Sequence, residues 1–512
     1  MLARVCSAAV LGVDAFRVDV EVDVAHGLPS FTVVGLPDGA VKESRDRVKA
    51  AVRNAGYRFP PHRITVNLAP ADVKKEGAAF DLPVALAVLA ADPDLKLSVP
   101  EGTLFLGELA LDGSVRPVRG VLPIALEARR LGFGALCVPR ENAVEAAVVQ
   151  GVAVHPADSI GQVVEGLRSG GLGRVEADPA EVLAARGAFD VDFAEVRGQA
   201  HAKRALEIAA AGGHNVLLVG PPGSGKTMLA RRLPTILPEM SWDECLETSR
   251  IYSAMGVRDG GSPLVVRRPF RAPHHTISDA GLIGGGTVPR CGEISLAHNG
   301  VLFLDELPEF KRHVLEVLRQ PLEDGEVTIS RASTTLTFPA RFTLVAAMNP
   351  CPCGYWGDPY RACSCSPSAL RKYRARVSGP LLDRFDLQVD VPAVPFRQIH
   401  GQGEPGEPSA EIRARVADAR RRQADRFRGT RITTNAAMTA RAVRRFATPA
   451  DDAEPVLRHA VERLGLSARA YTRVLKVART IADLAGSERV LREHVLEALQ
   501  FRTTVRSLGG TA

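Results

Sequence analysis

The chain has 512 residues, a formal net charge of +7, a pI near 9.1 and 46% hydrophobic residues. This length predicts about three domains with enough core to fold without disulfides, and no apolar stretch is long enough to cross a membrane. Four of the eight cysteines are clustered and the others are scattered, which favours a reducing cytoplasm, and the modest basic excess suits a phosphate-rich partner without proving one.

The chain divides into three segments at two linkers rich in glycine and charged residues. Residues 1–170 alternate strand signals, such as 64–68, with helix signals, which predicts an α/β domain. Its helices are expected at 41–55, 79–91, 122–131 and 142–149. Linkers at 171–189 and 396–409 separate this domain from a central segment, 190–395, and from a helical tail, 410–508.

A complete phosphate-binding loop opens the central segment. It reads Gly220-Pro221-Pro222-Gly223-Ser224-Gly225-Lys226-Thr227. A buried-strand pattern precedes it and a helix pattern follows, as the motif requires. Its backbone N–H groups would bind the β- and γ-phosphates of ATP, Lys226 would reach the same oxygens, and the Thr227 hydroxyl would ligate Mg²⁺.

An acidic pair completes the predicted site about 80 residues later. Four apolar residues lead directly to Asp305 and Glu306, the pattern of a buried strand that ends in carboxylates. Asp305 can hold the water shell of Mg²⁺, and Glu306 can polarise the attacking water. The chain is therefore predicted to hydrolyse ATP.

Two insertions lie within the central segment. The first carries the adjacent pair His274 and His275 in a Pro-rich loop, which we interpret as packing or hydrogen-bonding groups, with a metal site as the alternative. The second reads as two alternating strands, 325–332 and 334–338, a hairpin with Arg331 near its turn. By itself, Arg331 could equally be a solvent-facing turn residue.

Four cysteines follow the second insertion in the pattern C-x-C, nine residues, C-x-C. They are Cys351, Cys353, Cys363 and Cys365. Four thiolates so close in sequence can close a tetrahedral Zn²⁺ site and hold a loop that is poor in apolar residues. The spacing departs from the usual C-x₂-C, so reduced free thiols and disulfides stay open as alternatives.

Beyond these motifs, the central segment resembles the magnesium-chelatase-like branch of the AAA+ ATPases. Residues 345–350 resemble its sensor-1 strand, in which Asn349 would orient the lytic water. Residues 378–386 resemble its arginine-finger segment, and 466–471 in the tail resemble its sensor-2 helix. The resemblance implies that Arg384 reaches the ATP of a neighbouring subunit, that Arg469 contacts the γ-phosphate, and that the assembly is a homohexameric ring.

The first segment resembles the proteolytic domain of Lon proteases, in the form that is fused to chelatase-like ATPases of the YifB/ComM family. Residues 107–113 and 115–118 resemble the strand pair before Lon's lysine helix, and 75–79 resemble the loop that bears its serine. Ala79 stands at the serine position and Leu122 at the lysine position, so no peptidase dyad exists. The expected fold is therefore a multidomain α/β protein: a degenerate Lon-like domain, an AAA+ core and a C-terminal helical lid.

Three functions remain open at this point. The YifB/ComM resemblance implies a hexameric motor that binds single-stranded and branched DNA, with Arg331 gripping the backbone in the pore, and promotes branch migration in recombination and natural transformation. A metal-insertion ATPase of tetrapyrrole synthesis is the second. The third is an ATP-dependent protease or protein remodeller, against which the missing dyad argues.

Overall fold

The computed structural model describes residues 1–512 except 185–186, 188, 258–261, 287–288, 332–333, 359–360, 394–405 and 503–512. The chain forms two compact units. The first comprises Met1–Arg186 and Ser241–Val266, and the second comprises Gly187–Met240 and Arg267–Ala512. Among the residues that the structure describes, every helix is too short or too polar to span a bilayer.

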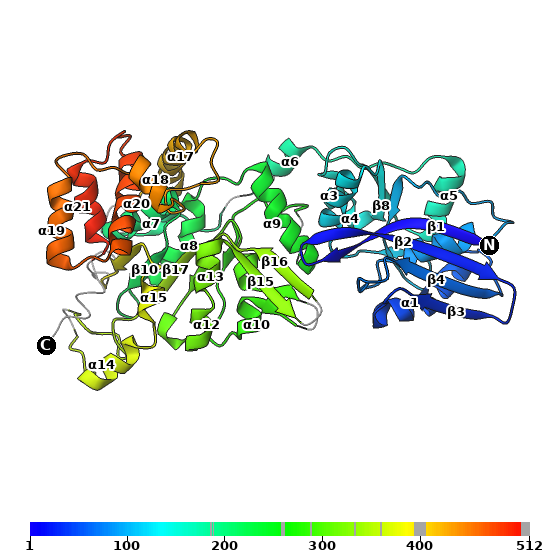
Figure 1. Ribbon diagram of the computed structural model, residues 1–512, viewed down its shortest axis with the longest axis horizontal. Helices are drawn as coiled ribbons and strands as arrows, with labels where there is room; N and C mark the ends of the chain where they lie inside the picture. Colours follow the sequence, from blue (N-terminus) through cyan, green and yellow to red (C-terminus); the bar gives the residue numbers. More distant parts are fainter. Residues whose placement is uncertain are drawn as a thin grey trace. The chain divides into compact units, whose positions relative to one another are not determined.

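A mixed seven-stranded sheet forms the centre of the first unit (Figure 1). Its strand order is β3-β4-β2-β1-β5-β8-β9, and β2 pairs antiparallel with both β1 and β4. The strands are β1 (Leu2–Leu11), β2 (Asp14–Ala25), β3 (Ser30–Val34), β4 (Arg63–Ala69), β5 (Thr103–Phe105), β8 (Ala135–Pro139) and β9 (Ala153–Ala157); β6 (Glu108–Leu109) and β7 (Val115–Arg116) form a separate hairpin. Val18, Val20 and Val22 of β2 are all fully buried, because alternate residues of a strand face the same side.

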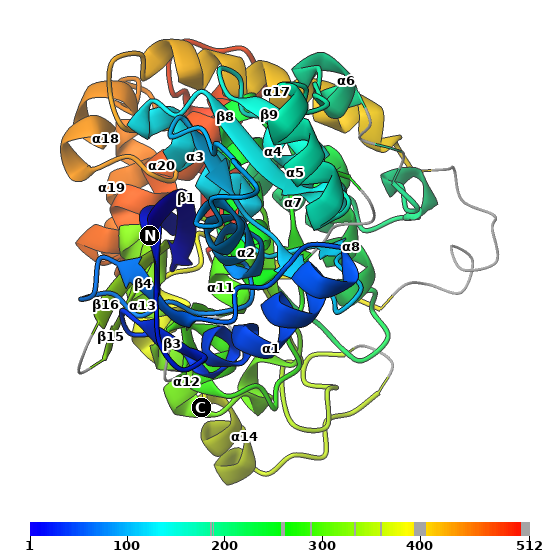
Figure 2. The same cartoon turned by 90° about the vertical axis from the view of Figure 1, so that its right-hand side faces the viewer.

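The helices of this unit match the four predicted ones to within two residues at each end. They are α1 (Gly39–Asn54), α2 (Asp81–Ala90), α3 (Val121–Leu131) and α4 (Arg140–Ala147), followed by α5 (Ile160–Ser169), α6 (Pro179–Ala184) and α9 (Trp242–Met255). Helix α6 lies within the stretch that was predicted as a linker, 171–189. The buried helix α2 packs against β1 and β2 (Figure 2).

Helix α9 comes from the central segment of the sequence but packs with the first unit. Ser241 caps it: its hydroxyl accepts from the Glu244 N–H at 3.2 Å, and the Glu244 side chain accepts from the Ser241 N–H at 2.9 Å. This reciprocal capping box satisfies two N–H groups that the helix cannot pair internally. Local sequence therefore specifies the helix, whereas its packing against α3 is a tertiary property.

A parallel five-stranded sheet forms the core of the second unit, with strand order β11-β14-β17-β10-β18. The strands are β10 (Val216–Val219), β11 (Phe270–Arg271), β14 (Val301–Leu304), β17 (Thr343–Met348) and β18 (Leu387–Asp390). Apart from β11 and the last residue of β18, every residue of these strands is buried. Parallel sheets need cover on both faces, and this accounts for the continuous apolar runs that were predicted as buried strands.

Short elements surround this sheet. They are η1 (Phe193–Glu195), α7 (Ala200–Gly212), α8 (Lys226–Ile236), α10 (Asp279–Leu282), α11 (Glu293–Leu296), η2 (Leu307–Glu309), α12 (Arg312–Glu316), α13 (Arg319–Asp324), α14 (Pro367–Arg374) and α15 (Gly379–Leu382). Two hairpins interrupt them: β12 (Gly284–Gly285) with β13 (Arg290–Cys291), and β15 (Glu326–Arg331) with β16 (Thr334–Pro339). The second is the predicted hairpin.

Five C-terminal helices complete the second unit. They are α17 (Ser409–Arg426), α18 (Ala440–Phe446), α19 (Glu454–Leu464), α20 (Ala468–Leu484) and α21 (Arg492–Gln500). They share one hydrophobic core with the parallel sheet, and α17 and α20 pack on α7 (Figure 1). The multidomain α/β architecture with a helical C-terminal region is therefore confirmed. Most of the predicted linker 396–409 and the end of the tail lie outside the described residues.

Candidate ATPase site

The phosphate-binding loop lies between β10 and α8, at the carboxyl end of the parallel sheet. Gly225 has φ +90° and precedes the first residue of α8, a left-handed conformation that glycine adopts without strain. Gly220 lies directly against the neighbouring strand end, since a Cβ there would stand 2.1 Å from the carbonyl oxygen of Val391. These two glycines let the loop wrap around the N-terminus of α8, an arrangement that binds phosphate.

The ammonium group of Lys226 lies inside this loop. Its Nζ donates to the carbonyl oxygens of Gly220 at 2.7 Å and Pro221 at 2.9 Å, and to Oδ1 of Asn349 at 3.2 Å. Burial lowers the pKa of Lys226 to about 8. The predicted phosphate ligand and the predicted sensor asparagine thus share one hydrogen bond.

Thr227 and Asp305 present two hard oxygens side by side. The Thr227 hydroxyl donates to Oδ2 of Asp305 at 2.6 Å, and the other oxygen of Asp305 accepts from the Glu306 N–H at 2.9 Å. Hydroxyl and carboxylate oxygens are the ligands that Mg²⁺ prefers in proteins. The donor set beside the phosphate-binding loop therefore fits a magnesium ion bound to a nucleotide.

Glu306 contacts His275, one of the two adjacent histidines of the Pro-rich loop. Its Oε2 lies 3.4 Å from Nδ1 of His275, which follows β11, the strand that pairs with β14. The His275 ring packs on the ring of His274, with centroids 4.1 Å apart, and edge-on to Phe310 at 6.4 Å. The interpretation of the histidine pair as packing and hydrogen-bonding groups is confirmed.

Arg384 lies at the other end of the same sheet. Strands β10 and β18 are parallel, with Val219 beside Asp390, so the loop that starts at Gly220 follows the carboxyl end, whereas Arg384 precedes the amino end of β18 at Leu387. Four residues of strand separate these ends by about 13 Å at about 3.3 Å per residue. The structure does not bring Arg384 to Lys226 of its own chain.

Arg384 belongs to a cluster of cations. It forms an ion pair with Glu323, and burial together with the guanidinium groups of Arg473, Arg469 and Arg319 lowers its pKa. Arg469 is the second residue of α20, and Arg473, one turn later, lies 3.4 Å from the Asp386 carboxylate. Within the described part of the chain, Nε of Arg384 and Nη1 of Arg473 are buried without a hydrogen-bond partner.

Arg473 was not singled out from the sequence. Its spacing from Arg469 could have identified it, because residues four apart on a helix share one face. Arg469 and Arg473 therefore lie on the same face of α20.

Arg331 is exposed at the end of β15, opposite Thr334 of β16. Its guanidinium lies beside β12, since a Cβ on Gly285 would stand 3.2 Å from Nη2. Ile329 likewise packs on Gly284, where a Cβ would stand 2.8 Å from its Cδ1. The two insertions therefore pack together in the second unit.

The four clustered cysteines converge on one point. Their sulfur atoms all lie within 4.8 Å of one another, and they form the one group of metal-ligating side chains found among the described residues. The cluster begins two residues after Asn349, so it adjoins the nucleotide site.

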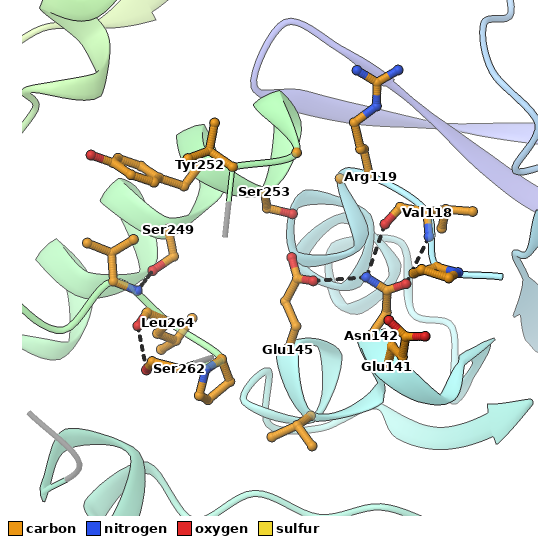
Figure 3. A pocket seen from close by; sticks show the side chains of 17 residues that line it. Val118, Arg119, Glu141, Asn142, Glu145, Ser249, Tyr252, Ser253, Ser262 and Leu264 are labelled. Carbon is orange, nitrogen blue, oxygen red and sulfur yellow. Dashed lines mark hydrogen bonds between the residues drawn. The ribbon is translucent and has the colours of Figure 1, made fainter. Parts of the chain in front are cut away.

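A cavity of about 450 Å³ lies in the first unit beside the start of α3 (Figure 3). Asn142 crosses its wall: Oδ1 accepts from the Val118 N–H at 2.9 Å, and Nδ2 donates to Glu145 at 3.2 Å. Oxygens of Glu145 and Ser253 each lie 3.3 Å from the N–H of Leu122. These groups satisfy one another and the first turn of α3. Leu122, where the Lon resemblance expects a lysine, is fully buried and has no amine.

Three family models of the magnesium-chelatase subunit together match most of the chain. "Magnesium chelatase, subunit ChlI" matches residues 192–399, and "Magnesium chelatase, subunit ChlI C-terminal" matches 406–502. "Subunit ChlI of Mg-chelatase" matches 20–142, the region for which the sequence predicts a Lon-like domain. The Lon resemblance itself stays a prediction.

Relatives that match over nearly their whole length identify the family within the magnesium-chelatase-like ATPases. The chain is 46% identical over 513 residues to "Competence protein ComM" of Haemophilus influenzae, covering 99% of this chain and 98% of that one. It is 43% identical over 507 residues to "Uncharacterized protein YifB" of Escherichia coli, with coverage of 99% and 98%. The "Magnesium-chelatase 38 kDa subunit" of Rhodobacter capsulatus is 28% identical over 216 residues, covering 39% of this chain and 55% of that one. The chain belongs to the YifB/ComM family of magnesium-chelatase-like ATPases.

Proposed function

We propose that this chain forms a homohexameric ring that binds single-stranded and branched DNA. The ring would use ATP hydrolysis to drive branch migration in homologous recombination and natural transformation. The observation that carries the ring is the placement of Lys226 and Arg384 at opposite ends of one sheet. A finger that cannot reach its own nucleotide can complete the site of a neighbour. The 46% identity to a competence protein over nearly the whole chain supports the DNA substrate.

Each site would combine groups from two subunits. The backbone of residues 220–227 and the ammonium group of Lys226 would hold the β- and γ-phosphates. Thr227 and Asp305 would hold Mg²⁺, which neutralises phosphate charge when bound. Glu306 takes the proton of the attacking water, and Asn349 orients that water. Arg384 of the neighbouring subunit stabilises charge on the transferred phosphoryl group, a contribution worth about 10³–10⁵ in turnover.

Arg469 would act on the same neighbouring nucleotide as Arg384. The two guanidinium groups lie close enough for Arg469 to contribute to the lowered pKa of Arg384, and Arg473 adds a third cation. Arg384 pairs with Glu323 and Arg473 with Asp386, whereas Arg469 is exposed. The γ-phosphate of a nucleotide in the next subunit would offset the combined positive charge of the three guanidinium groups.

DNA would be held by the hairpin of β15 and β16. Arg331 is exposed at its end and is supported from behind by β12, so its charge is free to meet a phosphate. Residues 190–395 would be the motor core, 410–508 the lid, and 1–170, without a dyad, a scaffold. The four-cysteine cluster would hold a structural Zn²⁺.

Two assays on purified protein test this function. The first measures the ATPase rate with and without single-stranded DNA, which we expect to stimulate turnover. The second follows a labelled four-way junction and a labelled protein substrate in parallel. ATP-dependent dissociation of the junction by branch migration supports the motor. Protein unfolding without junction processing would favour a remodeller instead.

A metal-insertion ATPase is the second candidate, because the core matches the chelatase description over 192–399. It predicts ATPase activity that responds to a tetrapyrrole-bearing partner and not to DNA. The same ATPase assay therefore separates the two candidates.

A further inference from the structure

The four-cysteine cluster has the dimensions of a tetrahedral thiolate site. Cys351 Sγ lies 3.3 Å from Cys353 Sγ and 3.7 Å from Cys363 Sγ, and Cys353 Sγ lies 3.5 Å from Cys363 Sγ. Four sulfurs at about 2.3 Å from a zinc ion are about 3.8 Å apart. A disulfide would need about 2.05 Å, and all four cysteines are free.

Backbone amides point at these sulfurs. The Trp356 N–H donates to Cys351 Sγ at 3.3 Å, and the N–H groups of Cys353 and Cys365 donate to Cys365 Sγ and Cys363 Sγ, both at 3.4 Å. Donors of this kind stabilise thiolates and orient them as metal ligands. The loop therefore supplies both the ligands and their supporting hydrogen bonds.

The cysteine loop contacts the nucleotide site at two points. The Tyr373 hydroxyl, on α14 just after the cluster, donates to the carbonyl oxygen of Asn349 at 3.2 Å, so the loop starts and ends at the sensor asparagine. Gly354, with φ +88°, packs on the phosphate-binding loop, since a Cβ there would stand 2.5 Å from Cδ of Pro222.

The described part of this loop buries few side chains. Among its described residues, 351–358 and 361–366, only Cys351 and Gly354 are buried. The aromatic contacts are peripheral: Arg361 donates to the Tyr355 hydroxyl at 2.9 Å, and Arg374 lies 5.5 Å from the ring centroid of the exposed Trp356. A loop without an apolar core needs another source of order, and a bound metal supplies it.

We propose that Cys351, Cys353, Cys363 and Cys365 bind one Zn²⁺ per chain and that this ion fixes Asn349 and Pro222 in the positions that nucleotide binding requires. The proposal rests on the ATPase function proposed above and adds to it a second metal, distant in role from Mg²⁺. Zinc contributes no chemistry to hydrolysis; its effect passes through the loop to the sensor asparagine and to the phosphate-binding loop.

Elemental analysis of protein purified without chelator tests the site. One zinc per chain is expected in the wild type and in Cys291→Ala, a buried cysteine outside the cluster that serves as the control. The double variant Cys353→Ser with Cys363→Ser should lose the ion. Absence of zinc from the wild type, or iron in its place with visible absorption, would overturn the zinc assignment.

Nucleotide binding tests the coupling. Zinc is stripped from the full-length wild type under reducing conditions, and the affinity for fluorescent ADP with Mg²⁺ is measured before stripping, after stripping and after zinc is restored. We expect the Kd to rise by about tenfold on stripping, the scale at which supporting groups act at metal sites, and to recover on restoration. An unchanged Kd in verified zinc-free protein would overturn the coupling.

A pair of glycine variants tests the contact without disturbing the metal. Gly354→Ala forces a methyl group against Pro222, so ADP affinity should fall while zinc content stays at one per chain. Gly357→Ala has a similar φ of +78° but nothing within 4 Å of the added carbon, and it should leave both unchanged. Equal ADP affinity in the two variants would contradict the proposal, whereas failure of DNA to stimulate the ATPase would contradict only the motor function.

Discussion

The imidazole of His275 and the carboxylate of Glu306 lie in contact, with Nδ1 3.4 Å from Oε2. The two residues follow neighbouring parallel strands, β11 and β14, and therefore meet at one edge of the sheet. Glu306 has φ +52° and its side chain is largely exposed, so the contact with His275 can restrain a carboxylate that little packing holds.

We expect His275→Asn to retain turnover and His275→Gln to lose about tenfold in kcat, with KM unchanged in both. The amide of Asn occupies the position of Nδ1, whereas the longer Gln mimics Nε2, and a misplaced proton acceptor loses part of the roughly 10²–10⁴-fold that general base catalysis contributes. Steady-state ATPase assays check this. His274→Asn is the matched control, because its Nδ1 contacts Thr276 and not Glu306, and Glu306→Gln sets the floor, with binding kept and turnover lost. Identical kinetics in the Asn and Gln variants would contradict the role.

Nucleotide affinity should depend on pH through Lys226. Burial lowers the pKa of this group to about 8, and bound phosphates favour its charged form, so the pKa rises on binding. Nucleotide affinity is therefore greatest below pH 8 and falls as the pH rises. The fall is up to about tenfold per pH unit and stops at the pKa that Lys226 has in the nucleotide-bound state. Titration of ADP between pH 7 and 9.5 measures this. Lys226→Arg should show a flat profile, because guanidinium stays charged, and Lys226→Ala should not bind.

Arg384→Ala should leave nucleotide binding and ring formation intact and reduce hydrolysis by about 10³-fold or more, because the finger acts on the neighbouring subunit. Mixing this variant with Lys226→Ala should restore part of the activity, since hybrid interfaces pair an intact finger with an intact loop. Arg376→Ala, an exposed arginine paired with Glu309 at 2.8 Å, is the control and should be near wild type. If hybrids form and stay inactive, Arg384 does not act in trans.

The residues predicted to bind the nucleotide can be found from the sequence alone, whereas the contact of His275 with Glu306 cannot. Lys226 and Thr227 belong to one contiguous motif, and Asp305 and Glu306 end one buried strand, so local pattern is enough to find them. His275 requires the pairing of β11 with β14, and β11 is only two residues long. No local pattern predicts such a strand, so the contact with Glu306 emerges only from the folded sheet.

The placement of Ser241–Val266 in the first unit likewise has no local signal in the sequence. The segment Ser241–Val266 lies between the two nucleotide motifs in sequence but packs with the first unit. Its capping box and helix pattern are local signals, whereas the surface that receives it depends on α3, more than a hundred residues earlier. The cysteine cluster shows the opposite case, because four cysteines within one short loop already predict a shared site, and the structure brings their sulfurs together.

No peptidase activity is expected, because Ala79 and the buried Leu122 stand where the predicted Lon resemblance places the dyad, and neither side chain can attack or activate. Incubation with labelled casein and ATP measures this. Lys226→Ala protein, purified in the same way, controls for contaminants, since a contaminating protease would cleave equally in both preparations. Cleavage that requires ATP and disappears in the Lys226→Ala protein would contradict the prediction.

Single-stranded DNA should bind the ATP-loaded ring with Arg331 as a principal backbone contact. Phosphate contacts release counterions, so the logarithm of affinity should fall with the logarithm of salt by about 0.7 per contact for single strands and about 0.9 for duplex. Arg331→Ala should reduce that slope by about one contact per engaged subunit and weaken binding to all sequences alike, because a backbone contact carries no base information.

Branch migration should fall together with DNA affinity in Arg331→Ala, while basal ATPase activity survives, since Arg331 lies beside β12 and not beside Lys226. Arg290→Ala, an exposed arginine of the other insertion, tests whether charge alone is responsible: it should change the slope less. Wild-type DNA affinity and junction processing in Arg331→Ala would remove the hairpin from the DNA path and favour a protein-remodelling role.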